Sequence, residues 1–396
     1  MITLRPKKPI TLTEPLVERV QVALVADPST PNSGVGRYTR MLTKGLPDAG
    51  VRSARFEPAP PELPGLLGDR TALRELLRRY PLWASYPPAE IYHLTSQNLA
   101  GLLLFCRPRG RTIVTVHDMP ARPLRTSRRQ DGHSNATERM LNRLALAGLR
   151  NADRLVTNSW HLKSCLVNQL SIRPDMIDVI YPGIDHQRYR PQLCPPEVRE
   201  RHGLRDNRRY LITVGADEPR KNLGALLQAL ALLRRTQPDI ELLKIGRPGL
   251  AAERKRLTDL ATDLGVAGAV HFLDDVPEED MPLLYSQSSL CVLPSHDEGF
   301  GFPALEAMAC GTPVVYAASA ALPEVVGRSG LTFKAGPDEH KELAAMITDA
   351  LDERTARLLR SAGMGRSGSY RWPQTINNLI ETYQRCEPNF KQEWTV

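Results

Sequence analysis

Short runs of apolar, often β-branched residues alternate along the chain with longer stretches whose apolar residues recur at helical spacing. Strands that are separated by helices are typical of βαβ units, which build parallel sheets. In the first half we predict strands at Val20–Ala26, Val51–Phe56, Ile91–Leu94, Thr112–His117, Arg154–Asn158 and Ile177–Tyr181. In the second half we predict strands at Tyr210–Val214, Glu241–Ile245, Val270–Leu273, Leu290–Pro294, Pro313–Ala317 and Leu331–Phe333. The predicted helices include Leu223–Arg235 and Glu339–Leu351.

One stretch interrupts this alternation, at His186–Arg209, which is rich in Arg and Pro and predicts a linker. We therefore predict an α/β fold of two doubly wound domains that face each other. The predicted boundaries are an N-terminal arm at 1–19, a first domain at 20–190, a linker at 191–209, a second domain at 210–370 and a final helical segment at 371–396. In open parallel sheets ligands bind beyond the carboxyl ends of the strands, so chemistry is expected there.

The composition is that of a globular protein with sizeable cores. The chain has 396 residues, of which 41% are hydrophobic and 24% charged, and this excludes fibrous and wholly disordered proteins. The longest apolar run, near Leu99–Cys106, is far shorter than the roughly 18 residues of a membrane span. Residues 1–19 lack the apolar core of a secretory signal. Six cysteines without metal-site spacing predict reduced thiols in a cytoplasmic protein.

Charge is distributed unevenly between the two halves. Residues 1–200 carry 29 basic and 18 acidic side chains, whereas residues 201–396 carry 23 and 26. A basic half and a near-neutral half suggest different partners for the two domains. A nucleic acid, an anionic membrane surface, a phosphorylated substrate and a merely solvated face are the alternatives for the basic half.

The junction with the richest chemistry lies in the segment LCVLPSHDEGFGFPALEAMACGTPVVYAASAALPEVVG, residues 290–327. A buried strand leads into a loop in which Gly299 and Gly301 flank Phe300, and a helix follows with Pro303 in its first turn. Backbone N–H groups of the loop and the helix N-terminus suit a diphosphate. Glu298 in the loop and Glu306 one turn into the helix do not help to bind phosphate, but they suit sugar hydroxyls.

A second junction, LITVGADEPRKN at 211–222, places two cations after a strand that ends at Gly215. Arg220 and Lys221 can neutralise a leaving diphosphate, although a solvated pair is the alternative. A third junction follows the first strand, where Gly34 and Gly36 open a helix. This loop lacks the third glycine of a dinucleotide fingerprint, because Thr39 stands there, and this argues against a dinucleotide oxidoreductase.

A fourth junction places His117 and Asp118 directly after a buried strand, at its carboxyl end. A single histidine is more often structural than catalytic. The position favours a functional interpretation of His117, with Asp118 either orienting the imidazole or binding an acceptor. Arg37 and Tyr38, after the third junction, are interpreted as packing or acceptor-side residues.

The segment around Glu298 and Glu306, which stand eight residues apart, resembles the E-x7-E signature of glycosyltransferase family 4. This is a large retaining group with the GT-B fold, two facing Rossmann-like domains whose last helix crosses back to the first domain. EGFGFP, LEAMACGTPV and LPEVVG also resemble the family, and the resemblance extends from about Val22 to Tyr383. It implies that Trp372 is a packing anchor and that the domains close about hinges near 186–209 and before Trp372.

The resemblance also implies roles for the residues at the four junctions. Glu298 would contact the donor sugar and support positive charge at its anomeric carbon, and Glu306 would bind the ribose hydroxyls of the nucleotide. Phe300 and Gly301 would offer backbone N–H groups to the diphosphate, and His117 would contact the donor sugar. The remaining donor-side residues are Gly34, Gly36, Gly215, Arg220 and Lys221, although many relatives carry an arginine where this chain has Ala216.

The implied activity is transfer of a sugar, with retention, from a nucleotide-diphosphate donor to an acceptor hydroxyl. The loop sequences resemble mannosyltransferases that use GDP-mannose, while UDP-sugars remain an alternative. We expect no cofactor and no required metal, because no D-x-D pair is evident and cations can act on the diphosphate. A cell-surface or lipid-linked glycan is the expected acceptor.

The basic segment Arg122–Arg129 could bind that acceptor, an anionic inner membrane face or solvent. Two other functions remain as rivals to an enzyme. One is a catalytically silent scaffold with the same fold. The other is a nucleic-acid-binding protein, which the absence of an RNA-binding motif and an aromatic content of only 6% disfavour.

Overall fold

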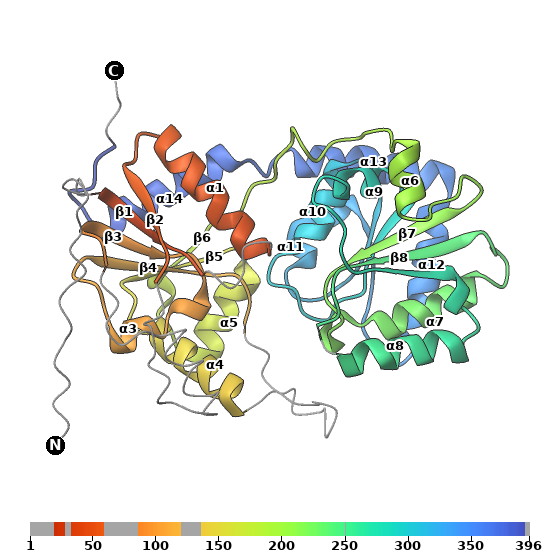
Figure 1. The fold of residues 1–396 in the computed structure, drawn as a ribbon, viewed down its shortest axis with the longest axis horizontal. Helices are drawn as coiled ribbons and strands as arrows, with labels where there is room; N and C mark the ends of the chain where they lie inside the picture. Colours follow the sequence, from red (N-terminus) through yellow and green to blue (C-terminus); the bar gives the residue numbers. More distant parts are fainter. Residues whose placement is uncertain (1–19, 28–32, 59–85, 120–135, 250, 393–396) are drawn as a thin grey trace.

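The structure, a computed structural model, describes residues 20–27, 33–58, 86–119, 136–249 and 251–392. Two α/β domains lie side by side, each with a central sheet between helices (Figure 1). The predicted arm at 1–19 and the basic segment Arg122–Arg129 lie outside the described residues. None of the helices in the described ranges is both long and apolar enough to cross a bilayer.

The first domain is built on a parallel sheet with the strand order β2-β1-β3-β4-β5-β6. Its strands are β1 (Val20–Val25), β2 (Ser53–Phe56), β3 (Ala89–Leu94), β4 (Arg111–Val116), β5 (Arg154–Thr157) and β6 (Ile177–Val179). Its helices are α1 (Gly34–Asp48), α3 (Leu102–Phe105), α4 (Ala136–Leu149) and α5 (Trp160–Leu170). The central strands are buried on both faces, which explains their continuous apolar runs.

The second domain repeats this plan with the strand order β12-β11-β10-β7-β8-β9, again all parallel. Its strands are β7 (Arg209–Val214), β8 (Ile240–Ile245), β9 (Val270–Leu273), β10 (Leu290–Leu293), β11 (Val314–Ala317) and β12 (Leu331–Phe333). Its helices are α7 (Leu223–Leu233), α8 (Ala251–Asp263), α9 (Met281–Gln287), α10 (Phe302–Ala309), α11 (Leu322–Val326), α12 (Glu339–Leu351) and α13 (Glu353–Ser367). Each of the twelve predicted strands is present, with ends that differ by two residues or fewer.

The predicted linker at 191–209 is not wholly irregular, because it contains the short helix α6 (Pro196–Arg201). Pro196 is its first residue, a position at which the missing N–H costs nothing. The chain crosses between the domains a second time just before the last helix. The two crossings lie together, because the Ile184 N–H donates to the Tyr370 carbonyl at 3.1 Å. A Cβ at Gly183 would lie 2.2 Å from the Trp372 nitrogen, so only glycine fits there.

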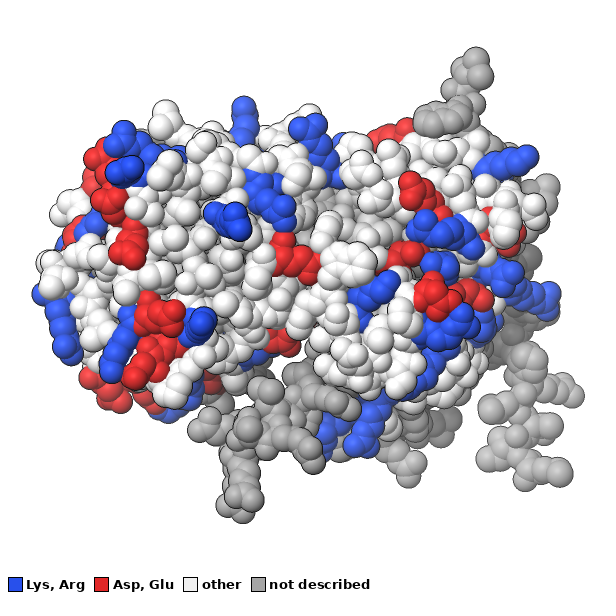
Figure 2. Space-filling model, turned by 180° about the vertical axis from the view of Figure 1, so that it is seen from behind, with Lys and Arg blue, Asp and Glu red and all other residues white. Residues whose placement is uncertain are grey.

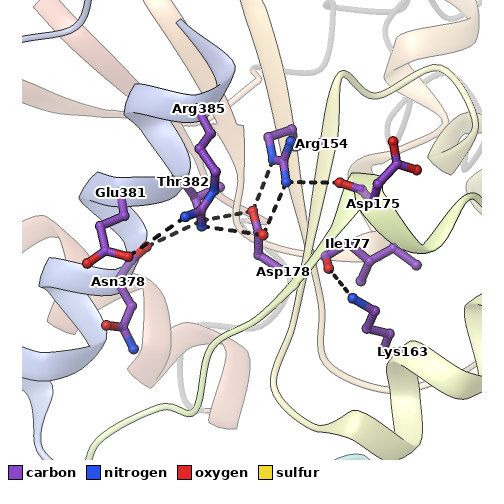
Figure 3. Close-up of polar contacts among 9 residues, drawn as sticks. All are labelled: Arg154, Lys163, Asp175, Ile177, Asp178, Asn378, Glu381, Thr382 and Arg385. Carbon is purple, nitrogen blue, oxygen red and sulfur yellow. Dashed lines mark hydrogen bonds and ion pairs between the residues drawn. The ribbon is translucent and has the colours of Figure 1, made fainter. Parts of the chain in front are cut away.

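The last helix, α14 (Trp372–Cys386), packs on the first domain, as predicted. Its buried face joins the apolar cluster between the first sheet and α1, where Trp372 lies 6.0 Å from the Tyr38 ring. Polar contacts also fasten it (Figure 3). Asp178 in β6 accepts hydrogen bonds from Arg154 at 3.0 and 3.1 Å and from Thr382 at 3.0 Å. Arg385 lies 3.3 Å from the same carboxylate.

Surface charge is mixed on the face shown in Figure 2. Lys and Arg side chains lie among Asp and Glu side chains on both domains of this face, and they do not merge into one basic field (Figure 2). The visible charges of this face therefore do not form the continuous basic surface that a nucleic-acid backbone would require.

Candidate active site

The carboxyl ends of the two sheets meet where the loop after β10 touches the loop after β4. A Cβ at Gly299 would lie 1.9 Å from the His117 carbonyl oxygen, so the two domains approach as closely as a glycine allows. Ser159, which caps α5, donates a hydrogen bond from Oγ to the Gly299 carbonyl at 2.7 Å. Asn158 donates to the His117 carbonyl at 3.2 Å. The structure thus brings the predicted first and fourth junctions together across the domain boundary.

Glu298 lies at this contact and is 7% exposed. Its Oε1 accepts hydrogen bonds from Lys221 Nζ at 2.6 Å and from Ser295 Oγ at 2.9 Å. Lys221 ends the 3-10 turn η4 (Pro219–Lys221), which follows β7. The first and second predicted junctions are therefore joined by a nearly buried ion pair, and a carboxylate and an ammonium are fixed side by side.

Arg220 points to different partners from those of its neighbour. Its Nε donates to Glu218 at 2.5 Å, and its terminal nitrogen donates to the Asp297 carbonyl at 3.1 Å. It holds the loops after β7 and β10 together. Its catalytic role stays a prediction.

Glu306 lies on α10 and is 3% exposed. One carboxylate oxygen accepts a hydrogen bond from the Tyr285 hydroxyl at 2.9 Å, and the other pairs with Arg37 of α1. The Glu306 charge raises the pKa of Arg37, so the guanidinium stays charged. Arg37 therefore reaches from the first domain to a predicted donor-binding carboxylate. Sequence reasoning noticed Arg37 but could not assign this partner.

Phe300 and Gly301 lead into α10, and Gly34 of α1 lies near its start. Gly301 precedes the helix with a φ of +99°, a conformation that favours glycine. The Phe300 ring is buried against Phe302 and Tyr370. Gly34 lies near α10, because its Cβ would be 3.7 Å from the Phe302 ring. The N–H of Gly36 already donates to the Ser33 cap at 3.2 Å.

His117 faces the same region from the first domain. Burial lowers the pKa of His117 to about 4. A hydrogen bond between Nε2 and the Thr95 carbonyl, at 2.9 Å, raises the pKa by a smaller amount. The neutral ring must carry its proton on Nε2 to make that bond, so Nδ1 is an acceptor. The Asp118 carboxylate accepts a hydrogen bond from the Gln97 amide, whose Oε1 accepts from the His117 backbone N–H at 3.0 Å, and the role of Asp118 stays a prediction.

Behind His117 lies a buried chain of uncharged polar groups. His93 contacts the Tyr383 hydroxyl of α14 through Nδ1 at 2.8 Å and Thr115 through Nε2 at 2.7 Å. Thr115 lies 3.3 Å from the Tyr38 hydroxyl, and the Tyr38 ring packs edge-on against His117 at 4.8 Å. Burial, with a smaller effect of His117, lowers the pKa of His93 to about 3. The last helix is thus joined to the predicted catalytic histidine.

A small pocket opens beside Lys221 at the carboxyl ends of β7 and β8. It is lined by Thr213, Val214, Gly215, Ala216, Lys221, Leu223, Lys244 and Ser295. Gly215 and Lys221 were expected here. Lys244 was missed by sequence reasoning, and the signal that could have revealed it is one lysine inside the apolar strand Ile240–Ile245.

Comparisons with known proteins agree with this architecture. Residues 32–188 match the family model described as Glycosyltransferase Family 4, and residues 196–363 match the one described as Glycosyl transferases group 1. A D-inositol 3-phosphate glycosyltransferase of Frankia alni is 34% identical over 250 residues, which cover 59% of each chain. The chain thus spans little more than half the length of the curated relatives it matches.

Solved structures resemble the chain over most of its length. Sucrose-phosphate synthase from Thermosynechococcus elongatus matches with a TM-score of 0.73 and 23% identity, over 93% of this chain and 99% of that one. Anabaena HepE in complex with UDP-glucose matches with a TM-score of 0.70 and 20% identity, over 93% and 100%. These likenesses, with the two six-stranded sheets, show the GT-B fold.

Proposed function

We propose that the protein is a family 4 glycosyltransferase that moves a sugar, with retention, from a nucleotide-diphosphate donor to an acceptor hydroxyl. Both domains match glycosyltransferase family models, which supports this family. The observation that carries the proposal is the Lys221–Glu298 pair, held at 2.6 Å where the two sheets meet. A leaving diphosphate is stabilised by a cation, and Lys221 supplies one. A sugar that develops positive charge is stabilised by a carboxylate, and Glu298 supplies it.

The reaction follows from where these groups lie. The bond between the anomeric carbon and the leaving phosphate breaks, and Lys221 and backbone N–H groups at the start of α10 take up the negative charge. Glu298 stabilises the positive charge on the sugar. The acceptor oxygen bonds to the same face of that carbon, and its proton passes to an oxygen of the leaving diphosphate. Cations and N–H groups do the work on the phosphate, so no metal is required.

Glu306 and His117 position the donor in this proposal. The Glu306 carboxylate accepts hydrogen bonds from the ribose hydroxyls. The same carboxylate also binds the Tyr285 hydroxyl and the Arg37 guanidinium. His117 offers a neutral ring whose Nδ1 accepts from a sugar hydroxyl, because Nε2–H is committed to Thr95. A protonated imidazole could not accept that bond, so the lowered pKa of His117 suits this role.

For the donor and the acceptor we propose chemical classes and not single compounds. The sequence favours GDP-mannose, while one solved structure with this fold contains UDP-glucose. For the acceptor, the inositol 3-phosphate relatives add a phosphorylated cyclitol to the cell-surface or lipid-linked glycan that the sequence suggested. Contact with an anionic membrane through Arg122–Arg129 is proposed only if the acceptor is a cell-surface or lipid-linked glycan.

The test is incubation of the protein with GDP-mannose and UDP-glucose, each with inositol 3-phosphate or a lipid-linked glycan extract. Proton NMR of the products reports the anomeric configuration. The proposal expects one donor to be consumed, with a product that keeps the donor's configuration. An inverted product would overturn retention. A protein that consumes neither donor with either acceptor would favour the catalytically silent scaffold.

A further inference from the structure

Two lysines from different loops and strands line the pocket beside Glu298. Lys221 comes from the turn after β7, and Lys244 comes from the end of the neighbouring strand β8. Gly215 and Ala216 also belong to the lining and bring no long side chain. Two lysines from separate elements are therefore lining residues of one small pocket at the carboxyl ends of β7 and β8.

Lys244 is buried to an extent that is unusual for lysine. The residue is 1% exposed, in a strand that is buried along its whole length. Its Nζ donates a hydrogen bond to the Gly246 carbonyl at 2.6 Å and lies 2.5 Å from Asp217 Oδ1. Burial lowers the pKa of Lys244, while Asp217 raises it.

The hydrogen bonds around Lys244 are incomplete. An ammonium has three N–H donors, and Gly246 takes one of them. Asp217 is fully buried, and its Oδ1 lies 2.5 Å from the Lys244 ammonium, so this carboxylate takes a second donor. The other oxygen of Asp217 accepts from Arg254 at 2.5 Å. Gly246 and Asp217 thus account for two of the three donors, and within the described residues one N–H donor of Lys244 is left for a group that enters the pocket.

We propose that Lys244 is a second phosphate-binding ammonium of the donor site, which binds the diphosphate together with Lys221. This inference rests on the proposed function, because it takes the nucleotide-diphosphate donor as the occupant of the pocket. A diphosphate has several acceptor oxygens, and two ammonium groups on different elements can bind it from two sides. Lys244 also stabilises the charge of the leaving group, since its N–H donors stay in place when the sugar departs.

The test measures binding of five probes by titration calorimetry. The probes are GDP, UDP, guanosine, uridine and inorganic pyrophosphate. The proteins are wild type, Lys244→Met and the control Lys255→Met, which removes an exposed lysine of α8. We expect Lys244→Met to bind the preferred diphosphate and pyrophosphate about tenfold or more weakly, with nucleoside affinity unchanged, because one charge-assisted hydrogen bond is lost. Lys255→Met should match the wild type.

A double variant separates phosphate binding from charge balance. Lys244→Met alone leaves Asp217 with one cation fewer, whereas Lys244→Met with Asp217→Asn removes both charges. If Lys244 binds phosphate, the double variant stays weak for diphosphates. If Lys244 only neutralises Asp217, the double variant regains wild-type affinity, and this result overturns the inference. Wild-type affinity in the single variant overturns it as well.

The same titrations distinguish this inference from the proposed function. A wild type that binds pyrophosphate but neither nucleotide would contradict the nucleotide donor, and a loss of pyrophosphate binding in Lys244→Met would still support the lysine. A wild type that binds a nucleotide with equal strength in all variants would support the donor class and overturn the role of Lys244. A wild type that binds none of the probes overturns both.

Discussion

The two sides of the interdomain contact are built from nearly the same fold but from different chemistry. On the second domain, charged groups come in pairs, Lys221 with Glu298 and Lys244 with Asp217. On the first domain, the buried polar groups that surround His117 and His93 are uncharged. Burial lowers the pKa of His117 to about 4 and that of His93 to about 3, so both rings are neutral at physiological pH.

Under the proposed function, this difference separates two tasks. Paired ions can be rearranged around an incoming diphosphate, because each cation exchanges one anionic partner for another. Neutral imidazole and hydroxyl groups suit sugar hydroxyls, which donate and accept hydrogen bonds without net charge. Arg37 is an exception, since it belongs to the first domain but pairs with Glu306 of the second. The first domain thereby contributes one charge to the second domain's side of the contact.

The largest effect is expected for Glu298→Gln, which tests the charged side of the contact, that is, the ion pairs of the second domain. The amide keeps the shape but cannot stabilise positive charge on the sugar, so kcat should fall about 10²- to 10³-fold. Donor affinity, measured by calorimetry, should change little. The matched control is Glu353→Gln, an exposed glutamate of α13. Full activity with normal donor binding would contradict the role of Glu298.

Gly299→Ala tests the contact between the two sides. The added Cβ would meet the His117 carbonyl at 1.9 Å, and the clash is relieved if the domains separate. We expect activity to fall about 10- to 100-fold, because reacting groups are displaced by an ångström or more. The midpoint of thermal unfolding should fall little, since each domain keeps its core.

Gly336→Ala is the control for this change, because no atom lies within 4 Å of its added Cβ. Small-angle scattering of both variants reports the domain separation. A Gly299→Ala enzyme that is as active as the control would show that catalysis does not need the close approach seen here.

The neutral side should make stability depend on pH. The unfolded chain protonates its histidines near pH 6.5, whereas His117 and His93 resist protonation down to about 4 and about 3. Between these values the unfolded state binds more protons, so the free energy of unfolding falls as the pH is lowered. The slope is about 1.4 kcal/mol per pH unit for each histidine.

Urea unfolding between pH 5 and 6.5 measures this slope, in a range where carboxylates stay largely ionised. His93→Gln should reduce the slope by about one histidine's share. An unchanged slope would mean that His93 is protonated in the folded protein at these pH values.

The smallest effect is expected for a charge pair outside the contact region. Arg385→Ala removes a half-exposed arginine from Asp178, which keeps Arg154 and Thr382. Unfolding should become easier by about 0.2–1 kcal/mol, as for other exposed pairs. Chemical denaturation measures this, and nucleotide affinity should stay unchanged. A large loss of nucleotide binding would mean that α14 controls the site more than the cleft charges do.

Local sequence patterns predicted the strands, helices and loops whose conformation depends on neighbouring residues along the chain. All twelve strands follow from β-branched runs, and α12 has the predicted bounds because its apolar periodicity is regular. The loop with Glu298 and Gly301 was found because glycines and a helix start leave a clear pattern. Helix α6 was missed, because a six-residue helix in an Arg- and Pro-rich stretch has too few apolar residues to show a period.

Contacts that depend on how the domains meet could not be predicted. Arg37 and Glu306 are 269 residues apart in sequence, and their pairing is set by the placement of two domains. The same holds for Gly299 against His117. Lys244 was missed for another reason. A single lysine in an apolar strand gives no sign of function in the sequence, and only the structure shows the pocket at the end of β8.

The most direct test of the account is a thermal-shift comparison of the wild type and Lys221→Met with GDP, UDP and ADP. We expect one nucleotide to stabilise the wild type, by about 2.7 kcal/mol at 100 times its dissociation constant. The shift should largely vanish in Lys221→Met, because the ammonium that binds the diphosphate is gone. A wild type that no nucleotide stabilises, or a variant that is stabilised equally, would contradict a diphosphate site on the charged side of the contact.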